Sequence, residues 1–325
     1  MKNRIVTIIG LFALLSTASA AGPKADFNVI PVPRTICAGT SAPFVLDSNT
    51  KIYYEEGQKR NAAFLQQYIT DITGIVPELT DRPRKRGTSL RVKDTSSDAE
   101  GYTLTVDKKN IHIVGNSPAG VFYAIQTLRK ALPAGQASEV EIPSCIVEDS
   151  PRFAYRGVHL DVVRHFFPVD SVKRYIDIIA LHNVNRFHWH LTDDQGWRIE
   201  IEKYPRLTQI GAYRDSTQIG GWNSPLYDAN IHGGYYTQED IREIVDFAAE
   251  RHIEIVPEIE MPGHTSAAIA AYPELGSLKT PPTVATYFNP TWGVFNVADE
   301  RVIQFIQDVF DEIFDLFPSR YIHIG

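Results

Sequence analysis

The sequence is poor in the features that mark several large classes of protein. Its 325 residues include only two cysteines and two methionines, and the formal net charge is −7. So few cysteines, with histidines dispersed along the chain, exclude zinc-finger spacing. Beyond the first 20 residues, no stretch comes near the roughly 18 consecutive apolar residues that a membrane helix needs. A hydrophobic content of 43% and a charged content of 22% are typical of a soluble globular protein.

The first 20 residues predict an export signal that is not part of the fold. Lys2 and Arg4 form a positive segment, residues 5–15 are apolar, and Ala18-Ser19-Ala20 has the small-x-small form of a signal-peptidase site. A signal anchor is the alternative. No cysteine follows the cleavage site, which argues against a lipid anchor. We therefore expect an exported protein, periplasmic or secreted, with no membrane partner.

Charge is distributed unevenly between the two halves of the chain. Residues 21–150 carry 15 basic and 15 acidic side chains, whereas residues 151–325 carry 15 basic and 24 acidic ones. An acidic half without a basic cluster is a poor nucleic-acid binder, because phosphate neutralisation needs concentrated positive charge. The isolated basic run at residues 82–86 is typical of a solvated loop. These patterns exclude nucleic acid as a partner.

Both cysteines, Cys37 and Cys145, lie in the neutral half. Export would permit a disulfide between them, near the start and end of that half. The sequence does not show whether their Cα atoms approach closely enough, so two buried thiols remain the alternative. It leaves the oligomeric state open as well.

Residues 21–150 predict a small α+β domain. Alternating apolar and polar residues indicate short strands, and apolar residues spaced three and four apart indicate two helices. Gly74 is placed to stop the first helix, and Ser117 followed by proline is a good start for the second. The expected strands are 51–54, 89–92, 102–106 and 110–114, the last two forming a hairpin.

Residues 151–325 alternate between strands and helices, which predicts a parallel sheet, open or closed into a barrel. The expected strands are 157–163, 184–191, 253–259 and 321–324, with helices beginning near Asp170, Thr237 and Asp299. A complete (β/α)₈ barrel takes about 250 residues and eight strands, so the four strands expected in these 175 residues would be half of the strands of a barrel.

Polar residues gather where the expected strands end. Two long excursions, 192–236 and 260–298, leave the carboxyl ends of the second and third strands, where barrels build their active sites. All four tryptophans lie after residue 150, and an indole beside carboxylates suits a concave carbohydrate pocket. For Trp189, between two histidines on a strand, we expect a core position. Trp222 and Trp292 fit packing and sugar binding equally well.

His188 and His190, two apart on a strand, point to the same face and could bind a divalent metal. Asp193, Glu258 and His264 could complete such a site, giving a metal-dependent hydrolase as an alternative function. A histidine pair satisfied by carboxylates inside the barrel is the plainer interpretation. We therefore predict no metal and no cofactor.

Arg164 follows a strand and has apolar neighbours. A buried guanidinium must find acidic or hydroxyl partners, because leaving it unpaired is very costly. Asp161 or Asp193 could pair with it as a structural ion pair. We favour the alternative that Arg164 binds hydroxyl groups of a substrate.

Four ordered motifs resemble family 20 of the glycoside hydrolases, the β-N-acetylhexosaminidases. They are RGVHLDVVRHFF at 156–167, HWHLTDDQGWR at 188–198, PEIEMPGH at 257–264 and YIHIG at 321–325. The last is similar to the start of the family's H-x-G-G-D-E motif. The resemblance extends over the mature chain, since residues 27–150 are similar to the small domain that precedes the family's barrel.

The resemblance implies an enzyme that removes terminal β-linked N-acetylglucosamine or N-acetylgalactosamine with retention of configuration, through attack by the substrate's own acetamido oxygen. It implies that Arg164 and Asp193 bind ring hydroxyls and that His264 lines the pocket. Glu260 stands where many members have aspartate, one methylene shorter.

The family's catalytic Asp-Glu pair would follow Gly325 by one glycine, and no other adjacent acidic pair in this sequence is a good substitute. We therefore expect a parent glycosidase of which these 325 residues are a truncated, inactive piece. A non-catalytic carbohydrate-binding protein is the second hypothesis. The expected organisation is a signal peptide at 1–20, the α+β domain at 21–150 and the first half of a TIM barrel at 151–325.

Overall fold

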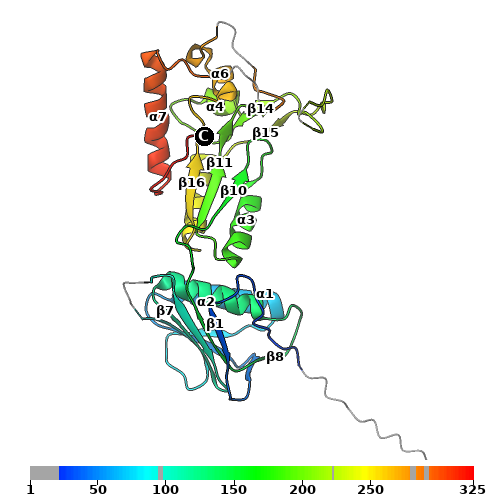
Figure 1. Ribbon diagram of the computed structural model, residues 1–325, viewed down its shortest axis with the longest axis vertical. Helices are drawn as coiled ribbons and strands as arrows, with labels where there is room; N and C mark the ends of the chain where they lie inside the picture. Colours follow the sequence, from blue (N-terminus) through cyan, green and yellow to red (C-terminus); the bar gives the residue numbers. More distant parts are fainter. Residues whose placement is uncertain (1–21, 94–97, 222, 279–282, 289–292) are drawn as a thin grey trace, which may run out of the picture.

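The structure is a computed structural model, and it describes residues 22–93, 98–221, 223–278, 283–288 and 293–325. Figure 1 shows two units along the chain, a sheet covered by two helices and then an α/β unit that carries the C-terminus. The predicted signal peptide and the two loop tryptophans, Trp222 and Trp292, lie outside the described residues. Among the described residues, no helix is long and apolar enough to cross a membrane.

The first unit is built on a seven-stranded mixed sheet in the order β1-β9-β6-β7-β5-β3-β4. The predicted hairpin is confirmed, because β6 and β7 pair antiparallel. A separate antiparallel pair joins β2 to β8. The bounds are β1 Thr35–Ala38, β2 Phe44–Asp47, β3 Lys51–Tyr54, β4 Glu78–Thr80, β5 Gly87–Val92, β6 Tyr102–Val106, β7 Asn110–Gly115, β8 Glu139–Ile142 and β9 Cys145–Asp149.

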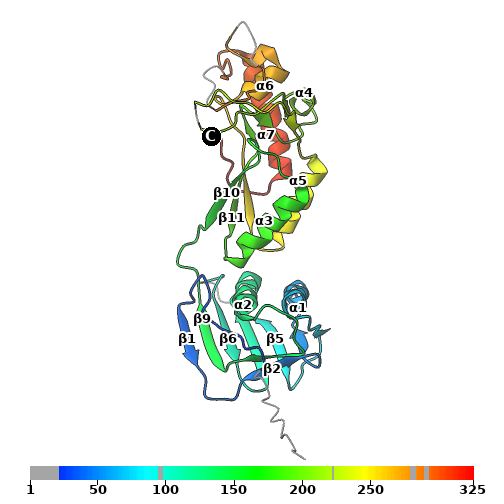
Figure 2. The same ribbon diagram turned by 90° about the vertical axis from the view of Figure 1, so that its right-hand side faces the viewer.

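Two helices, α1 (Lys59–Thr73) and α2 (Pro118–Ala131), cover one face of this sheet (Figure 2). Their ends follow the predicted signals. Gly74 adopts a left-handed conformation with φ 77°, which glycine accepts without the Cβ penalty of other residues. The Ser117 side chain accepts a hydrogen bond from the backbone N–H of Ala119.

The second unit contains a three-stranded parallel sheet in the order β10-β11-β16. Its strands are shorter than predicted, because only five residues of each form the ladder: β10 Gly157–Asp161, β11 Arg186–His190 and β16 Glu254–Glu258. Helix α3 (Val169–Leu181) connects β10 to β11, α5 (Gln238–Ala249) precedes β16, and α7 (Glu300–Leu316) follows it. This strand and helix alternation is the one that the sequence predicts.

The predicted fourth strand at 321–324 is replaced by a single bridge. His323 pairs in parallel with Glu258, and the backbone N–H groups of Ile259 and Met261 donate to the carbonyls of His323 and Ile324 at 3.0 and 3.1 Å. The segment therefore lies beside β16 in the expected place. Among the described residues, this contact does not extend into a ladder.

The two long excursions gather beyond the carboxyl ends of the parallel strands (Figure 1). They hold short elements that the sequence patterns did not indicate. These are β12 Thr192–Asp193, β13 Gly196–Trp197, α4 Arg206–Gln209, β14 Tyr213–Arg214, β15 His232–Gly233, α6 Ser266–Ala271 and the 3₁₀ turn Pro273–Leu275.

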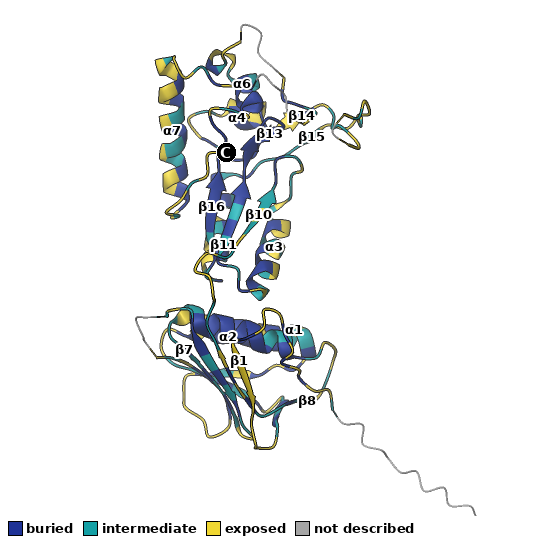
Figure 3. Cartoon of the chain, viewed as in Figure 1, coloured by how far each residue is buried: buried dark blue, intermediate teal, exposed yellow. Residues whose placement is uncertain are grey.

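On the parallel sheet, the residues of β10 are exposed or half-buried, whereas most residues of β11 and β16 are buried (Figure 3). Trp189 is fully buried, which confirms the predicted core position, and its ring packs against Phe187 and Tyr236.

The two units also contact each other through an ion pair between side chains. Arg129 of α2 pairs with Asp177 of α3 at 2.9 Å. Both cysteines are free thiols, so the structure has no disulfide between them. The alternative of two buried thiols is confirmed for Cys145 and is wrong for Cys37, which is exposed.

The capping box at the start of α5 supports a stability prediction. Thr237 accepts a hydrogen bond from the Asp240 backbone N–H, and Asp240 accepts one from the Thr237 backbone N–H. Replacing a threonine cap with alanine costs about 1 kcal/mol. We expect Thr237→Ala to lower the free energy of unfolding in urea by that amount, and the exposed-loop variant Thr283→Ala to leave it unchanged.

Candidate active site at the carboxyl ends of the parallel strands

Arg164 lies just past β10 and forms a fork between two carboxylates. Its guanidinium contacts Asp161 at 2.9 Å and, more closely, Asp193. Its Nε–H donates to the side-chain oxygen of Gln195 at 3.0 Å. The Arg164 side chain keeps 31% of its surface exposed, whereas Asp193 keeps 1%. The Arg164 guanidinium is therefore held by carboxylates and still partly exposed. This is compatible with both predicted roles, a structural ion pair and the binding of substrate hydroxyl groups.

Asp193 and Asp194 hold His264 at the mouth of the site. The His264 Nδ1 atom lies 3.0 Å from Asp194 and 3.3 Å from Asp193. Asp194 also accepts hydrogen bonds from the backbone N–H and hydroxyl of Ser266, at the start of α6, at 3.0 and 2.6 Å. Burial raises the pKa of Asp193 to about 6, although the charge of Arg164 acts in the opposite direction.

His190, on β11, lies at the centre of the carboxylates. Its ring nitrogens are 3.5 Å from Glu260, 3.6 Å from Asp193 and 3.9 Å from both Asp161 and Glu258. Burial alone would lower the pKa of His190, but these carboxylates, Glu260 first, raise it. The ring thus lies between Glu260 and Asp193 and contacts both carboxylates.

A second cluster surrounds Glu258 deeper in the sheet. His188 lies 2.7 Å from this carboxylate, His323 lies 3.1 Å from it and His159 lies 3.7 Å from it. Burial opposes ionisation of Glu258, but the hydrogen bond with His188 and the nearby imidazoles lower its pKa to about 2.

The potential metal ligands lie in these same two clusters. Nitrogen and oxygen atoms of His188, Glu258 and His323 lie within 4.8 Å of one another, as do those of His190, Asp193 and Glu260. Imidazoles and carboxylates are ligands that Zn²⁺ accepts. The same atoms lie within ion-pair distance of one another, which is compatible with the plainer role that the sequence predicted for the histidine pair. Among the described residues, however, Nε2 of His188, Nε2 of His190 and Oδ2 of Asp193 have no partner in hydrogen-bonding geometry, so both interpretations stay predictions.

The lowered pKa of Glu258 leads to a pH prediction. Its ionised form stabilises the fold above the ordinary pKa of 4.5, and this contribution is lost as the pH falls towards about 2. Allowing for partial solvent screening, we expect Glu258→Gln to lower the free energy of unfolding at pH 7 by about 2 kcal/mol. The deficit, measured by urea unfolding, should shrink below pH 4.5. Exposed Glu148→Gln should show no deficit at either pH.

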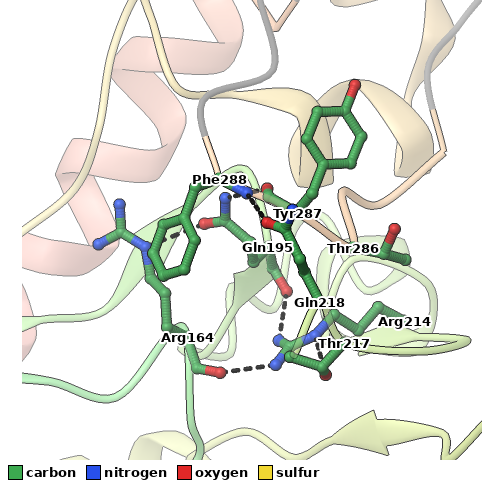
Figure 4. A pocket seen from close by; sticks show the side chains of 8 residues that line it. All are labelled: Arg164, Gln195, Arg214, Thr217, Gln218, Thr286, Tyr287 and Phe288. Atoms are coloured by element: carbon green, nitrogen blue, oxygen red, sulfur yellow. Dashed lines mark hydrogen bonds between the residues drawn. The ribbon is translucent and has the colours of Figure 1, made fainter. Parts of the chain in front are cut away.

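A small pocket is lined on one side by Arg164 (Figure 4). Gln195 also lines it, accepting a hydrogen bond from Arg164 and donating one to the backbone carbonyl of Tyr287 at 2.8 Å. Arg214 forms its floor and hydrogen-bonds the Arg164 carbonyl. The remaining lining residues come from the two excursions: Thr217, Gln218, Thr286, Tyr287 and Phe288.

The structure brings all four predicted substrate-binding residues to one edge of the sheet. Asp193 contacts Arg164 on one side and His264 on the other. Glu260 contacts His190, which in turn lies near Asp193. Trp197 is buried, with its indole N–H donating to the Ile199 carbonyl, so it does not line the site as an exposed platform. The sequence patterns missed the roles of Asp194, Gln195 and Arg214. Of these, only Asp194 and Gln195 fall within a quoted motif.

Comparison with known proteins gives matches over nearly all of the chain. Residues 153–325 match the family model described as the catalytic domain of glycosyl hydrolase family 20, and residues 26–150 match the model for domain 2 of the same family.

Curated relatives of the chain are named as beta-hexosaminidases. The chain is 40% identical to a beta-hexosaminidase of Porphyromonas gingivalis over 313 residues, which cover 92% of this chain and 38% of the relative. It is 37% identical to a beta-hexosaminidase of Vibrio furnissii, covering 94% and 49%. The chain thus spans less than half the length of these two relatives.

Solved structures agree in fold. The N-acetyl-beta-hexosaminidase of Streptomyces plicatus, solved in complex with Thio-NAglucal, superposes with a TM-score of 0.81 at 38% identity, covering 91% of this chain and 58% of that one. A family 20 beta-N-acetylhexosaminidase of Streptomyces coelicolor gives the same TM-score at 37% identity, covering 91% and 59%. Against these neighbours, the second unit is part of a TIM barrel, and the first unit is the domain that precedes it.

Proposed function

Because this chain belongs to family 20 of the glycoside hydrolases, we propose that the complete protein is a β-N-acetylhexosaminidase that removes terminal N-acetylglucosamine or N-acetylgalactosamine from β-linked glycans. The observation that supports this most directly is the contact of Arg164 with Asp193 and of Asp193 with His264, at the carboxyl ends of parallel strands. A variant of the Streptomyces plicatus enzyme has been solved with the product GlcNAc, which supports a sugar of this kind as ligand.

Arg164 and Asp193 are proposed to bind the ring hydroxyls at the non-reducing end of the sugar. The guanidinium supplies several N–H donors in a fixed plane, and the carboxylate supplies acceptors, so together they match neighbouring hydroxyls that both donate and accept. Their mutual ion pair keeps both groups charged and oriented before the sugar enters, which lowers the entropic cost of binding.

Glu260 and His264 are proposed to complete the wall of the pocket. His264 is about half exposed, and Asp193 and Asp194 hold its Nδ1 side, so its other ring nitrogen is left to face a ligand. Burial acts to lower the pKa of His264, but these two carboxylates raise it, which favours a charged donor. Glu260 is buried beside His190 and accepts no contact from Arg164 among the described residues.

The proposed reaction is substrate-assisted. The acetamido oxygen attacks the anomeric carbon while a carboxylic acid protonates the leaving oxygen, and water then opens the resulting oxazolinium with retention of configuration. In the family that acid belongs to an Asp-Glu pair following a segment like His323–Gly325. The 325 residues do not include it, so we propose that they do not turn over substrate by themselves.

The activity is tested with the protein expressed from its complete reading frame and with residues 21–325 alone. We expect the complete protein to release 4-nitrophenol from 4-nitrophenyl N-acetyl-β-D-glucosaminide. We also expect ¹H NMR to show the β-anomer of the sugar as the first product. Residues 21–325 should release none. An α-anomer as the first product would contradict the mechanism, and turnover by residues 21–325 would contradict the assignment of the acid.

Export is proposed from the leader alone. If residues 1–20 are a signal peptide, the mature protein begins at Ala21, which intact-mass measurement of the protein recovered outside the cytoplasm would detect. A mass that retains the leader would contradict cleavage at this site.

A further inference from the structure

Two arginines are buried beneath the site without a carboxylate partner among the described residues. Arg198 is fully buried and Arg214 is 3% exposed. A buried guanidinium without a carboxylate carries a large desolvation cost, so it persists where its hydrogen bonds are numerous and well directed. Both guanidinium groups here bind backbone carbonyl oxygens, which tie together segments far apart in the sequence.

Two of the carbonyls that they bind, those of Val163 and Arg164, belong to the segment that carries the Arg164 side chain. Arg214 donates from Nη2 to the carbonyl of Arg164 itself at 2.6 Å and from Nη1 to the carbonyl of Gln195 at 3.1 Å (Figure 4). Its Nε–H donates to the hydroxyl of Thr217 at 3.0 Å. Arg198 binds the preceding carbonyl, that of Val163, at 2.6 Å. The guanidinium of Arg214 therefore joins the backbone of Arg164 to the backbone of Gln195.

That connection has a geometric consequence for the sugar-binding side chain. The Arg164 Nε–H donates to the side chain of Gln195, so the two side chains must be held at a fixed separation for this 3.0 Å hydrogen bond to persist. Arg214 fixes the backbone from which each of them extends. The donors of Arg214 are already taken by two backbone carbonyls and the Thr217 hydroxyl. Arg214 lines the small pocket beside Arg164, but only 3% of its surface is exposed there.

We propose that Arg214 is a positioning residue for substrate binding: it holds the backbones of Arg164 and Gln195 so that the Arg164 guanidinium faces the sugar hydroxyls in a fixed orientation. This rests on the proposed function, in which Arg164 binds the sugar. Lysine cannot replace Arg214 fully, because one ammonium cannot donate in the planar fork that reaches two separate carbonyls and a hydroxyl.

The kinetic test uses the complete protein with 4-nitrophenyl N-acetyl-β-D-glucosaminide. A misoriented hydroxyl clamp weakens binding of ground and transition states alike, so we expect Arg214→Gln to raise KM about tenfold with kcat changed less than about threefold. Arg214→Lys should recover part of that loss. Thr217→Val, which removes one partner of Arg214, should raise KM about twofold to threefold as a milder change.

Two controls separate positioning from general damage. Arg251 is also a buried arginine that donates to a backbone carbonyl, that of Phe247, but it lies far from the site, between α5 and the first unit. Arg251→Gln should leave KM unchanged. In an Arg164→Ala background, Arg214→Gln should add less than about twofold, because the side chain that it positions is gone. Independent, multiplying losses in the double variant would overturn the proposal.

A measurement that does not need activity makes the outcome decisive. In protein labelled with ¹⁵N-arginine, the Arg164 Nε–H, which is hydrogen-bonded to Gln195, should give a protected signal that is lost in Arg164→Lys. We expect Arg214→Gln to remove this protection and Arg251→Gln to preserve it. A protected Arg164 signal in folded Arg214→Gln overturns the positioning role. Absence of hydrolysis by the wild type would instead overturn the proposed function, leaving this signal to decide the positioning role.

Discussion

Arg164→Ala is expected to reduce kcat/KM for a β-N-acetylglucosaminide by about 1,000-fold in the complete protein. Hydrogen bonds to a charged group contribute roughly 1.5–3 kcal/mol each, and the exposed guanidinium can give at least two to neighbouring hydroxyls. The variant also leaves Asp193 buried without its closest cation, which disturbs the second hydroxyl-binding group. Most of the loss should be in KM, since the hydroxyls are bound before and during the reaction.

The conservative variant and a distant one define how this loss is interpreted. Arg164→Lys keeps the charge but not the planar fork, so it should recover no more than about tenfold of the loss. Arg152→Ala, an exposed arginine near the start of the second unit, should leave kcat/KM unchanged. An Arg164→Ala enzyme with nearly normal KM would show that this side chain forms a structural ion pair only.

Asp193→Asn is expected to reduce kcat/KM by about 100-fold at pH 7. The carboxylate contacts Arg164 on one side and His264 on the other, and an amide removes the charge from both contacts while keeping the shape. Burial raises the pKa of Asp193 to about 6. The wild-type profile of kcat/KM should therefore rise with pH around 6 as Asp193 ionises, and Asp193→Asn should lack this limb.

Stability measurements distinguish this effect from unfolding. A carboxyl with a raised pKa disfavours the fold once it ionises, so its contribution falls as the pH rises from about 4 to about 6 and stays low above that. Asp193→Asn removes this cost and should be no less stable than the wild type at pH 7. Exposed Asp311→Asn is the matched control for kinetics and stability. An unchanged acid limb in Asp193→Asn would contradict the assignment of Asp193.

Local signals in the sequence located the helices better than the strands. Gly74, Ser117 and Thr237 act within one turn of chain, so their roles as helix ends can be predicted without knowing the rest of the fold. Strands β1 and β9 were not predicted. Their pairing joins residues more than 100 positions apart, and β1 is exposed along its whole length, so it carries no burial pattern.

Of the site residues, too, some could be predicted from the sequence and others depend on the fold. The motifs led to Arg164, Asp193, Glu260 and His264, all of which the structure brings to one edge of the sheet. They predicted carboxylate partners for the pair His188 and His190, but not that His190 lies near four of them, because that position depends on β11 lying between β10 and β16. Arg214 lies in no motif. Its contact with the Arg164 carbonyl arises only when an excursion folds back over the strand ends.

Substrate-assisted catalysis is tested most directly by comparing two substrates that differ only at the 2-position of the sugar. The complete protein should hydrolyse 4-nitrophenyl N-acetyl-β-D-glucosaminide and should leave 4-nitrophenyl β-D-glucopyranoside intact under the same conditions, because the glucoside lacks the acetamido group that acts as nucleophile. Comparable hydrolysis of the glucoside, or hydrolysis of neither substrate, would contradict the proposal that this chain belongs to a substrate-assisted hexosaminidase.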